Sequence, residues 1–187
     1  MYRPRIRCRG RRRYPTHHEE ASASTVDTLD ALIEIPEGSR NKYEYDRRTG
    51  RIYFNRMLFS SIRYPANYGL IPETLALDGD ELDILVVTSE PVFPGCYVEC
   101  RPIGGLDMWD EKGPDEKILA VPVGEPRWRS ISSHTQLPAH MLHEIEHFFL
   151  RYKELEHKET GVGGWRDATW AVKIIEECKE RYRQHNA

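Results

Sequence analysis

The sequence has no long apolar run, few cysteines and no apolar leader. No stretch of about 18 apolar residues occurs, so we expect no membrane span. The first residues lack the apolar core of a secretory signal, which favours a cytoplasmic protein in a reducing compartment. The 4 cysteines show no spacing typical of a metal site, and we expect ordinary thiols.

Length and composition favour one folded domain. The chain has 187 residues, of which 39% are hydrophobic and 30% charged, as in an ordinary water-soluble domain with its own core. We predict that this domain spans residues 29–187.

Acidic residues are absent from residues 1–13, which contain seven arginines: Arg3, Arg5, Arg7, Arg9, Arg11, Arg12 and Arg13. A stretch rich in Ser, Thr and Ala then runs to Thr28. Such a segment cannot bury enough apolar surface to fold, so we predict a disordered extension over residues 1–28. Weak contact with nucleic acid or an anionic surface is the alternative interpretation of this tail. Without these seven charges, the formal net charge of -3 becomes -10 for residues 14–187, so nucleic-acid binding by the domain itself is not expected.

Short apolar or alternating runs predict strands over residues 32–35, 43–45, 52–54, 82–88, 97–103 and 117–123. They are separated by Pro, Gly and turn signals such as Arg48-Thr49-Gly50. This pattern indicates a barrel or sandwich-like β domain. After Pro138 the apolar period changes to three and four residues, which predicts a helix, and a second helix is expected to begin at Asp167 as its N-cap.

Carboxylates are concentrated in two segments. Asp78, Asp80 and Asp83 fall within six residues, directly before the apolar run 84–87, and Asp110 and Asp115 follow about thirty residues later. Carboxylate oxygens are preferred ligands of Mg²⁺, which takes only one or two of them per ion. The sequence therefore indicates several Mg²⁺ ions.

Other polar residues would suit a phosphate ligand. Lys42 and Glu44 are two apart in a predicted strand and so share a face, whereas Glu34 points away from its neighbours Ile33 and Ile35. Taken singly, each has an ordinary structural interpretation. The remaining candidates are Arg56, Tyr64, Tyr68, Lys117, Tyr152 and Lys153.

Together these residues give residues 33–165 a resemblance to the soluble family I inorganic pyrophosphatases of bacterial type. The matching segments occur in the family's order: 33–36, 41–44, Arg56, 64–69, 78–83, Pro94-Gly95, Asp110-Glu111, 115–117, 147–149 and Tyr152-Lys153. The resemblance implies an α+β, mostly β fold, with a five-stranded OB-like closed barrel flanked by two main C-terminal helices. It also implies a homohexamer.

The implied reaction is Mg²⁺-dependent hydrolysis of inorganic diphosphate to two orthophosphates by a metal-activated water, without a covalent intermediate. Mn²⁺ or Zn²⁺ are possible substitutes. By resemblance, the metal ligands are Glu34, Asp78, Asp83, Asp110 and Asp115, and the catalytic base is Asp80. The implied substrate-binding residues are Lys42, Glu44, Arg56, Tyr64, Tyr68, Lys117, Tyr152 and Lys153. Asn55 departs from the pattern, since many relatives have an acid there.

The sequence also allows comparison with three other classes of protein. A Ca²⁺-binding EF-hand requires an oxygen at the fifth loop position, where this chain has Leu82, and flanking helices rather than a strand. A non-enzymatic OB-like binding module lacks a basic groove in this acidic domain. A metal-dependent hydrolase of another phosphoanhydride stays open and is separated by comparing turnover of diphosphate with that of ATP.

Overall fold

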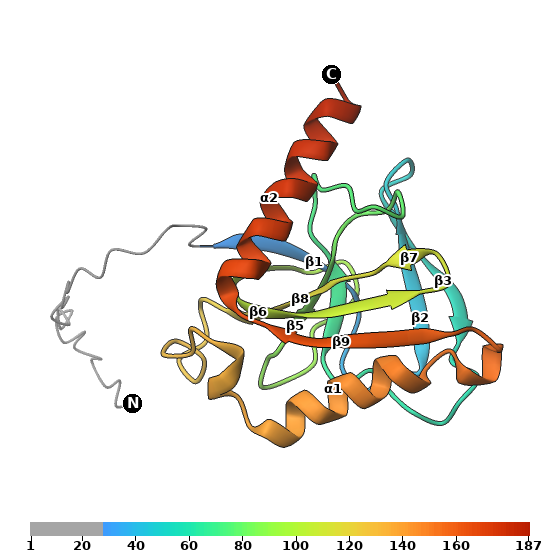
Figure 1. The fold of residues 1–187 in the computed structure, drawn as a ribbon, viewed down its shortest axis with the longest axis horizontal. Coiled ribbons are helices and arrows are strands. Elements are labelled where there is room, and N and C mark those ends of the chain that lie inside the picture. The colour runs from blue at the N-terminus through green and yellow to red at the C-terminus, as the bar shows by residue number, and fades with distance from the viewer. Residues whose placement is uncertain (1–27) are drawn as a thin grey trace, which may run out of the picture.

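Five strands pair in a closed ring in the computed structural model, which describes residues 28–187 (Figure 1). The predicted extension 1–28 lies, apart from Thr28, outside the described residues. The ring runs β1 (Leu29–Ile35), β4 (Asn67–Leu70), β5 (Asp83–Val86), β8 (Lys117–Pro122) and β6 (Tyr97–Asp110), and β6 pairs back onto β1. The β5–β8 pair is parallel and the other pairs are antiparallel. The predicted five-stranded closed barrel is confirmed.

Both faces of the central strands are buried, which explains their continuous apolar runs. Leu85 and Leu119 belong to a core shared with the first long helix, α1 (Ala139–Arg151). Their neighbours Ile84 and Ile118 belong to a second core shared with α2 (Ala168–His185). Successive residues of a strand point to opposite faces, so one short strand contributes to both cores.

The two predicted helices are confirmed. Helix α1 buries Leu142, Ile145 and Phe149, and α2 begins after Asp167, whose Oδ1 accepts the N–H of Trp170 at 2.9 Å. Two 3-10 turns, η1 (His134–Gln136) and η2 (Glu154–Glu156), flank α1. No helix within residues 28–187 is long and apolar enough to cross a membrane.

A hairpin of β2 (Asn41–Asp46) and β3 (Arg51–Met57) stands apart from the ring as a two-stranded sheet. Its register places Lys42 opposite Arg56 and Glu44 opposite Tyr53. The turn is closed by Asp46, whose Oδ1 accepts the N–H groups of Arg48 and Thr49 at 2.8 and 3.2 Å. This hairpin forms one wall of the cavity described below.

Strand β6 extends to Asp110, beyond its predicted end at Ile103, and pairs with two strands that were not predicted, β7 (Gly113–Pro114) and β9 (Thr160–Arg166). Gly104 and Gly105 look like a strand end in the sequence. In the structure they allow close packing, because a Cβ on Gly104 would lie 2.6 Å from the Arg166 carbonyl oxygen and one on Gly105 2.7 Å from the Trp170 ring.

Candidate active site

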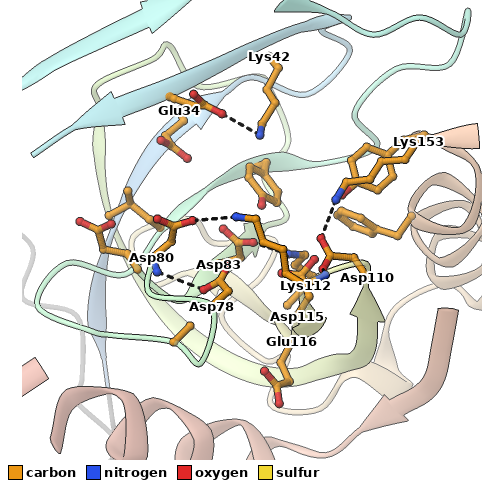
Figure 2. A pocket seen from close by; sticks show the side chains of 18 of the residues that line it. Glu34, Lys42, Asp78, Asp80, Asp83, Asp110, Lys112, Asp115, Glu116 and Lys153 are labelled. Atoms are coloured by element: carbon orange, nitrogen blue, oxygen red, sulfur yellow. Dashed lines mark hydrogen bonds and ion pairs between the residues drawn. The ribbon is translucent and has the colours of Figure 1, made fainter. Parts of the chain in front are cut away.

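One cavity of about 440 Å³ is lined by all fourteen residues predicted for the site (Figure 2). They come from β1, the β2–β3 hairpin, β4 and the loop before it, the acidic segment that runs into β5, the β6–β8 region and the residues that follow α1. Segments that are remote in the sequence thus meet at one cavity. Their individual roles remain predictions.

The acidic segment is held as a tight loop. Asp78 Oδ1 accepts the N–H of Asp80 at 3.1 Å, and the Asp80 carbonyl accepts the N–H of Ala76 at 2.8 Å. Gly79 adopts a φ of 94°, which a residue with a side chain rarely tolerates. At the base of the loop, the buried Thr74 hydroxyl donates to the Ile71 carbonyl and accepts the N–H of Leu82. The loop therefore presents its carboxylates to the cavity from a fixed base.

Lys117 lies between two of the predicted metal ligands. Its Nζ donates to Asp115 Oδ1 at 2.5 Å and also to Asp83 Oδ2, and only 2% of its side chain is exposed. The parallel pairing of β5 with β8 sets Asp83 opposite Lys117. Burial alone would lower the pKa of Lys117, but the two carboxylates raise it. Burial raises the pKa of Asp115, and the charge of Asp83 adds to this.

A second cationic group lies where α1 ends. Lys153 Nζ donates to Asp110 Oδ2 at 2.6 Å and to Glu111 Oε2 at 3.2 Å, while Lys158 contacts Glu111 Oε1 at 2.9 Å. Burial opposes ionisation of Glu111, but the two lysines outweigh it and lower its pKa to about 2. These carboxylates therefore stay charged at neutral pH.

Glu34 is buried, and its Oε1 accepts the N–H of Tyr45 at 2.6 Å. Burial raises the pKa of Glu34 to about 8, despite the opposing effect of this hydrogen bond. Burial therefore favours the protonated form of Glu34 when no cation is bound. Figure 2 shows Glu34 on the same side of the site as Lys42, whose Nζ pairs with Glu44.

Arg56 is held from two sides. Its Nε and Nη2 donate to Glu156 at 2.8 to 3.0 Å, and its Nη1 donates to Asn55 Oδ1 at 3.0 Å. Asn55 in turn donates to Glu44 Oε2 at 2.8 Å, and Lys42 contacts Glu44 Oε1 at 2.9 Å. Asn55 thus links Glu44 with Arg56. An ionised acid at this position could still accept from Arg56 but could not donate to Glu44.

Three tyrosines pack against two phenylalanines of α1 at the inner wall. The ring of Tyr64 lies 4.7 Å from that of Phe148, the ring of Tyr152 5.3 Å from Phe148, and the ring of Tyr68 6.3 Å from Phe149. Burial raises the pKa of all three phenols. They remain neutral hydroxyl groups that can donate hydrogen bonds to an anion.

The sequence predictions missed several residues that contribute to this site. Glu156, which binds Arg56, gave no signal because it is 100 residues away in the chain. Two other missed residues, Glu81 and Glu111, could have been predicted, because each directly follows a predicted site residue in an acidic segment. The additional lining residues are Tyr45, Leu70, Ala76, Glu81, Glu111, Lys112, Pro114, Glu116, Phe149 and Lys158.

The donor set fits a hard divalent cation. Carboxylates outnumber amines and guanidinium groups on the wall, and Mg²⁺ prefers oxygen ligands. Within residues 28–187, no three carboxylate, His or Cys side chains are already gathered as a metal cage, and Lys117 holds Asp83 and Asp115 together instead. Burial is the main cause of the raised pKa values of Glu34 and Asp115, and the nearby charge of Asp83 adds to both.

A closed ring of strands with one cavity that gathers carboxylates beside amines and phenols fits a hydrolase of small phosphoanhydrides. The sequence profile of the inorganic pyrophosphatases matches residues 31–183, and the chain belongs to this family. The inorganic pyrophosphatase of Methanosarcina mazei is 57% identical over 153 residues, covering 82% of this chain and 90% of that protein. That of Halalkalibacterium halodurans is 51% identical over 155 residues, covering 83% and 95%.

The solved structures agree with this assignment. The inorganic pyrophosphatase of Coxiella burnetii superposes with a TM-score of 0.81 at 42% identity, covering 87% of this chain and 99% of that one. The enzyme of Thermus thermophilus gives 0.82 at 40% identity, covering 88% and 97%. The predicted enzyme class, a hydrolase acting on the phosphoanhydride bond of inorganic diphosphate, is confirmed.

Proposed function

We propose that the chain hydrolyses diphosphate with Mg²⁺ as its cofactor, by direct attack of a water molecule for which Asp80 is the general base. The observation that supports this most strongly is that one cavity gathers Asp80, the predicted metal ligands and the predicted phosphate-binding residues. Glu34, Asp78, Asp83, Asp110 and Asp115 would hold the magnesium ions. When bound, magnesium would neutralise phosphate charge and acidify a water molecule.

Asp80 is suited to accept a proton. Its carboxyl group is 73% exposed, and its ion-pair partner among the described residues, the Nζ of Lys112, is 3.6 Å away. As water attacks one phosphorus atom, its proton passes to the Asp80 carboxylate. The bond from that phosphorus to the bridging oxygen breaks, and its electrons leave with the second phosphate.

The amines, guanidinium and phenols would bind the substrate's phosphate oxygens. Diphosphate carries about three negative charges near neutral pH, so phosphoryl transfer depends on charge neutralisation and positioning. Lys42, Arg56, Lys117 and Lys153 supply positive charge around the cavity, while the tyrosines supply neutral donors. All four of these cations are already paired with carboxylates, which restricts their positions before substrate arrives.

The proposal is tested by measuring orthophosphate release from diphosphate with Mg²⁺, with EDTA, and with ATP in place of diphosphate. Rapid Mg²⁺-dependent release from diphosphate, with little from ATP, supports it. Equal turnover of ATP would favour a broader phosphoanhydride hydrolase, and full activity in EDTA would contradict the cofactor assignment. Homohexamer formation is proposed from the family resemblance, and light scattering tests it. Cytoplasmic localisation is proposed from the sequence.

A further inference from the structure

Arg47, at the end of the β2–β3 hairpin, contacts the acidic loop that the proposed function uses. Its Nε and Nη2 both lie 2.6 Å from Oε1 of Glu81, which lies between Asp80 and Leu82. The Glu81 side chain is 16% exposed and that of Arg47 47%. The Nε–H donates a hydrogen bond to this oxygen and Nη2 adds an ion-pair contact, so the pair is a directed contact rather than a loose surface pair.

Helix α2 supports the same arginine. The Arg47 guanidinium lies over the ring of Tyr182, with 5.4 Å from its central carbon to the ring centroid. This cation–π contact fixes the plane of the guanidinium group while its edge faces Glu81. The hairpin, the acidic loop and the C-terminal helix thus meet at Arg47.

The base of the loop is attached to the same helix. The Leu75 N–H donates to the Cys178 carbonyl at 3.0 Å, and Arg181 Nε donates to the Leu75 carbonyl at 2.9 Å. The loop is therefore tied to α2 before Asp78 and tied to the hairpin at Glu81. Between these two attachments lie Asp78 and Asp80.

We propose that Arg47 is a positioning residue for the magnesium site: it holds Glu81 so that the loop carrying Asp78 and Asp80 keeps its place beside Asp83. The inference rests on the proposed function, since it concerns the proposed magnesium ligands. Partners that orient metal ligands typically change metal affinity by about 10–100-fold when removed.

The sign of the effect separates positioning from simple electrostatics. Arg47 is a cation near a cluster of carboxylates, so its charge alone opposes the binding of Mg²⁺. Removing it would tighten Mg²⁺ binding if charge were its only contribution. If Arg47 positions the loop, removing it weakens binding.

The test is calorimetric titration of the full-length chain with MgCl₂ in the absence of substrate, comparing wild type with Arg47→Ala and the control Arg48→Ala. Arg48 is the next residue in the turn, is 84% exposed and pairs only loosely with Asp46 at 3.6 Å, so its variant measures the loss of charge alone. We expect about tenfold weaker Mg²⁺ binding for Arg47→Ala. Arg48→Ala should bind as the wild type does or slightly more tightly.

Three further variants test whether the effect of Arg47 passes through Glu81. Glu81→Gln should weaken Mg²⁺ binding. The double variant with Arg47→Ala should bind Mg²⁺ little more weakly than Glu81→Gln alone, because both changes break the same contact between Arg47 and Glu81. Tyr182→Phe keeps the ring and should bind Mg²⁺ as the wild type does. Far-ultraviolet circular dichroism checks that each variant is folded.

The outcomes distinguish this inference from the proposed function. Wild-type or tighter binding by folded Arg47→Ala, or fully additive losses with Glu81→Gln, would overturn the positioning role while leaving the magnesium site intact. A wild-type chain that binds no Mg²⁺ would overturn the proposed cofactor and this inference together.

Discussion

Arg56 and Glu156 form a two-pronged ion pair across 100 residues of sequence, with Nη2 lying 2.8 Å from each carboxylate oxygen. The Glu156 side chain is only 9% exposed. The pair joins the β2–β3 hairpin to the turn that follows α1. A predicted phosphate-binding guanidinium is thus oriented by a carboxylate that sequence motifs did not reveal.

Replacing Glu156 with Gln should therefore impair substrate binding. We expect kcat/KM for diphosphate to fall about tenfold, mainly through KM, because Arg56 loses a charged partner but remains present. Steady-state kinetics at saturating Mg²⁺ measure this. The matched control is Glu154→Gln on the same turn, whose carboxylate is 60% exposed and pairs with Arg151 outside the cavity lining. An equal effect in both variants would show that Arg56 does not depend on Glu156.

This pair also illustrates where sequence reasoning succeeded and failed. The fourteen residues were predicted because their types and order match a family, and the fold places them around one cavity, while their roles stay predictions. Contacts such as Arg56 to Glu156 depend on where two distant segments meet in space, and neither segment's local pattern contains that information.

The missed strands have a similar physical origin. Strand β9 contains Gly161, Gly163 and Gly164, which alone would indicate a turn. In the structure, a Cβ on Gly161 would come within 2.3 Å of the Trp109 ring, so the glycine allows β9 to pack closely against β6. Local propensity favours a loop here, and tertiary packing overrides it. Helix α2 was easier to predict because its N-cap and its apolar period are both local signals.

Asp80→Asn should cut turnover by about 10²-fold or more while leaving the fold intact, if Asp80 accepts the proton of the attacking water. The side chain is largely exposed, so the amide fits without steric change. Single-turnover orthophosphate release, together with circular dichroism, provides the measurement. Turnover near that of wild type would remove Asp80 from the role of base.

Mg²⁺ should stabilise the folded protein, because cations that bind only the native state shift the unfolding equilibrium. One site at a free Mg²⁺ concentration 100-fold above its Kd contributes roughly 2.7 kcal/mol. Thermal unfolding in EDTA and in Mg²⁺ at matched ionic strength measures the shift in Tm. Asp78→Asn should show a smaller shift. An unchanged Tm in saturating Mg²⁺ would contradict a native-state metal site.

The chelated protein should lose stability as the pH rises, owing to Glu34. Its pKa is about 8 in the folded state against 4.5 for the ordinary carboxyl, so the folded state binds the proton more tightly. The stabilising contribution is fully present below about pH 4.5 and is lost as the pH rises towards 8, by on the order of 3 kcal/mol at pH 7. Urea unfolding in EDTA across this range should show a smaller decline for Glu34→Gln. A parallel decline in both proteins would exclude Glu34 as its source.

Asn55→Asp should alter the hairpin side of the site without abolishing activity. Asn55 donates to Glu44 and accepts from Arg56, whereas an ionised Asp can only accept. The substitution would therefore set two carboxylates against each other, which raises the pKa of one of them. We expect the acidic limb of the pH profile of kcat/KM to move to higher pH, with the plateau falling less than about tenfold.

Asn55→Ser serves as the control, since it loses the bridge between Glu44 and Arg56 without adding charge. If Asn55→Asp and Asn55→Ser give the same profile, the added charge has no effect, and Asn55 matters only as a hydrogen-bonding bridge between its two neighbours.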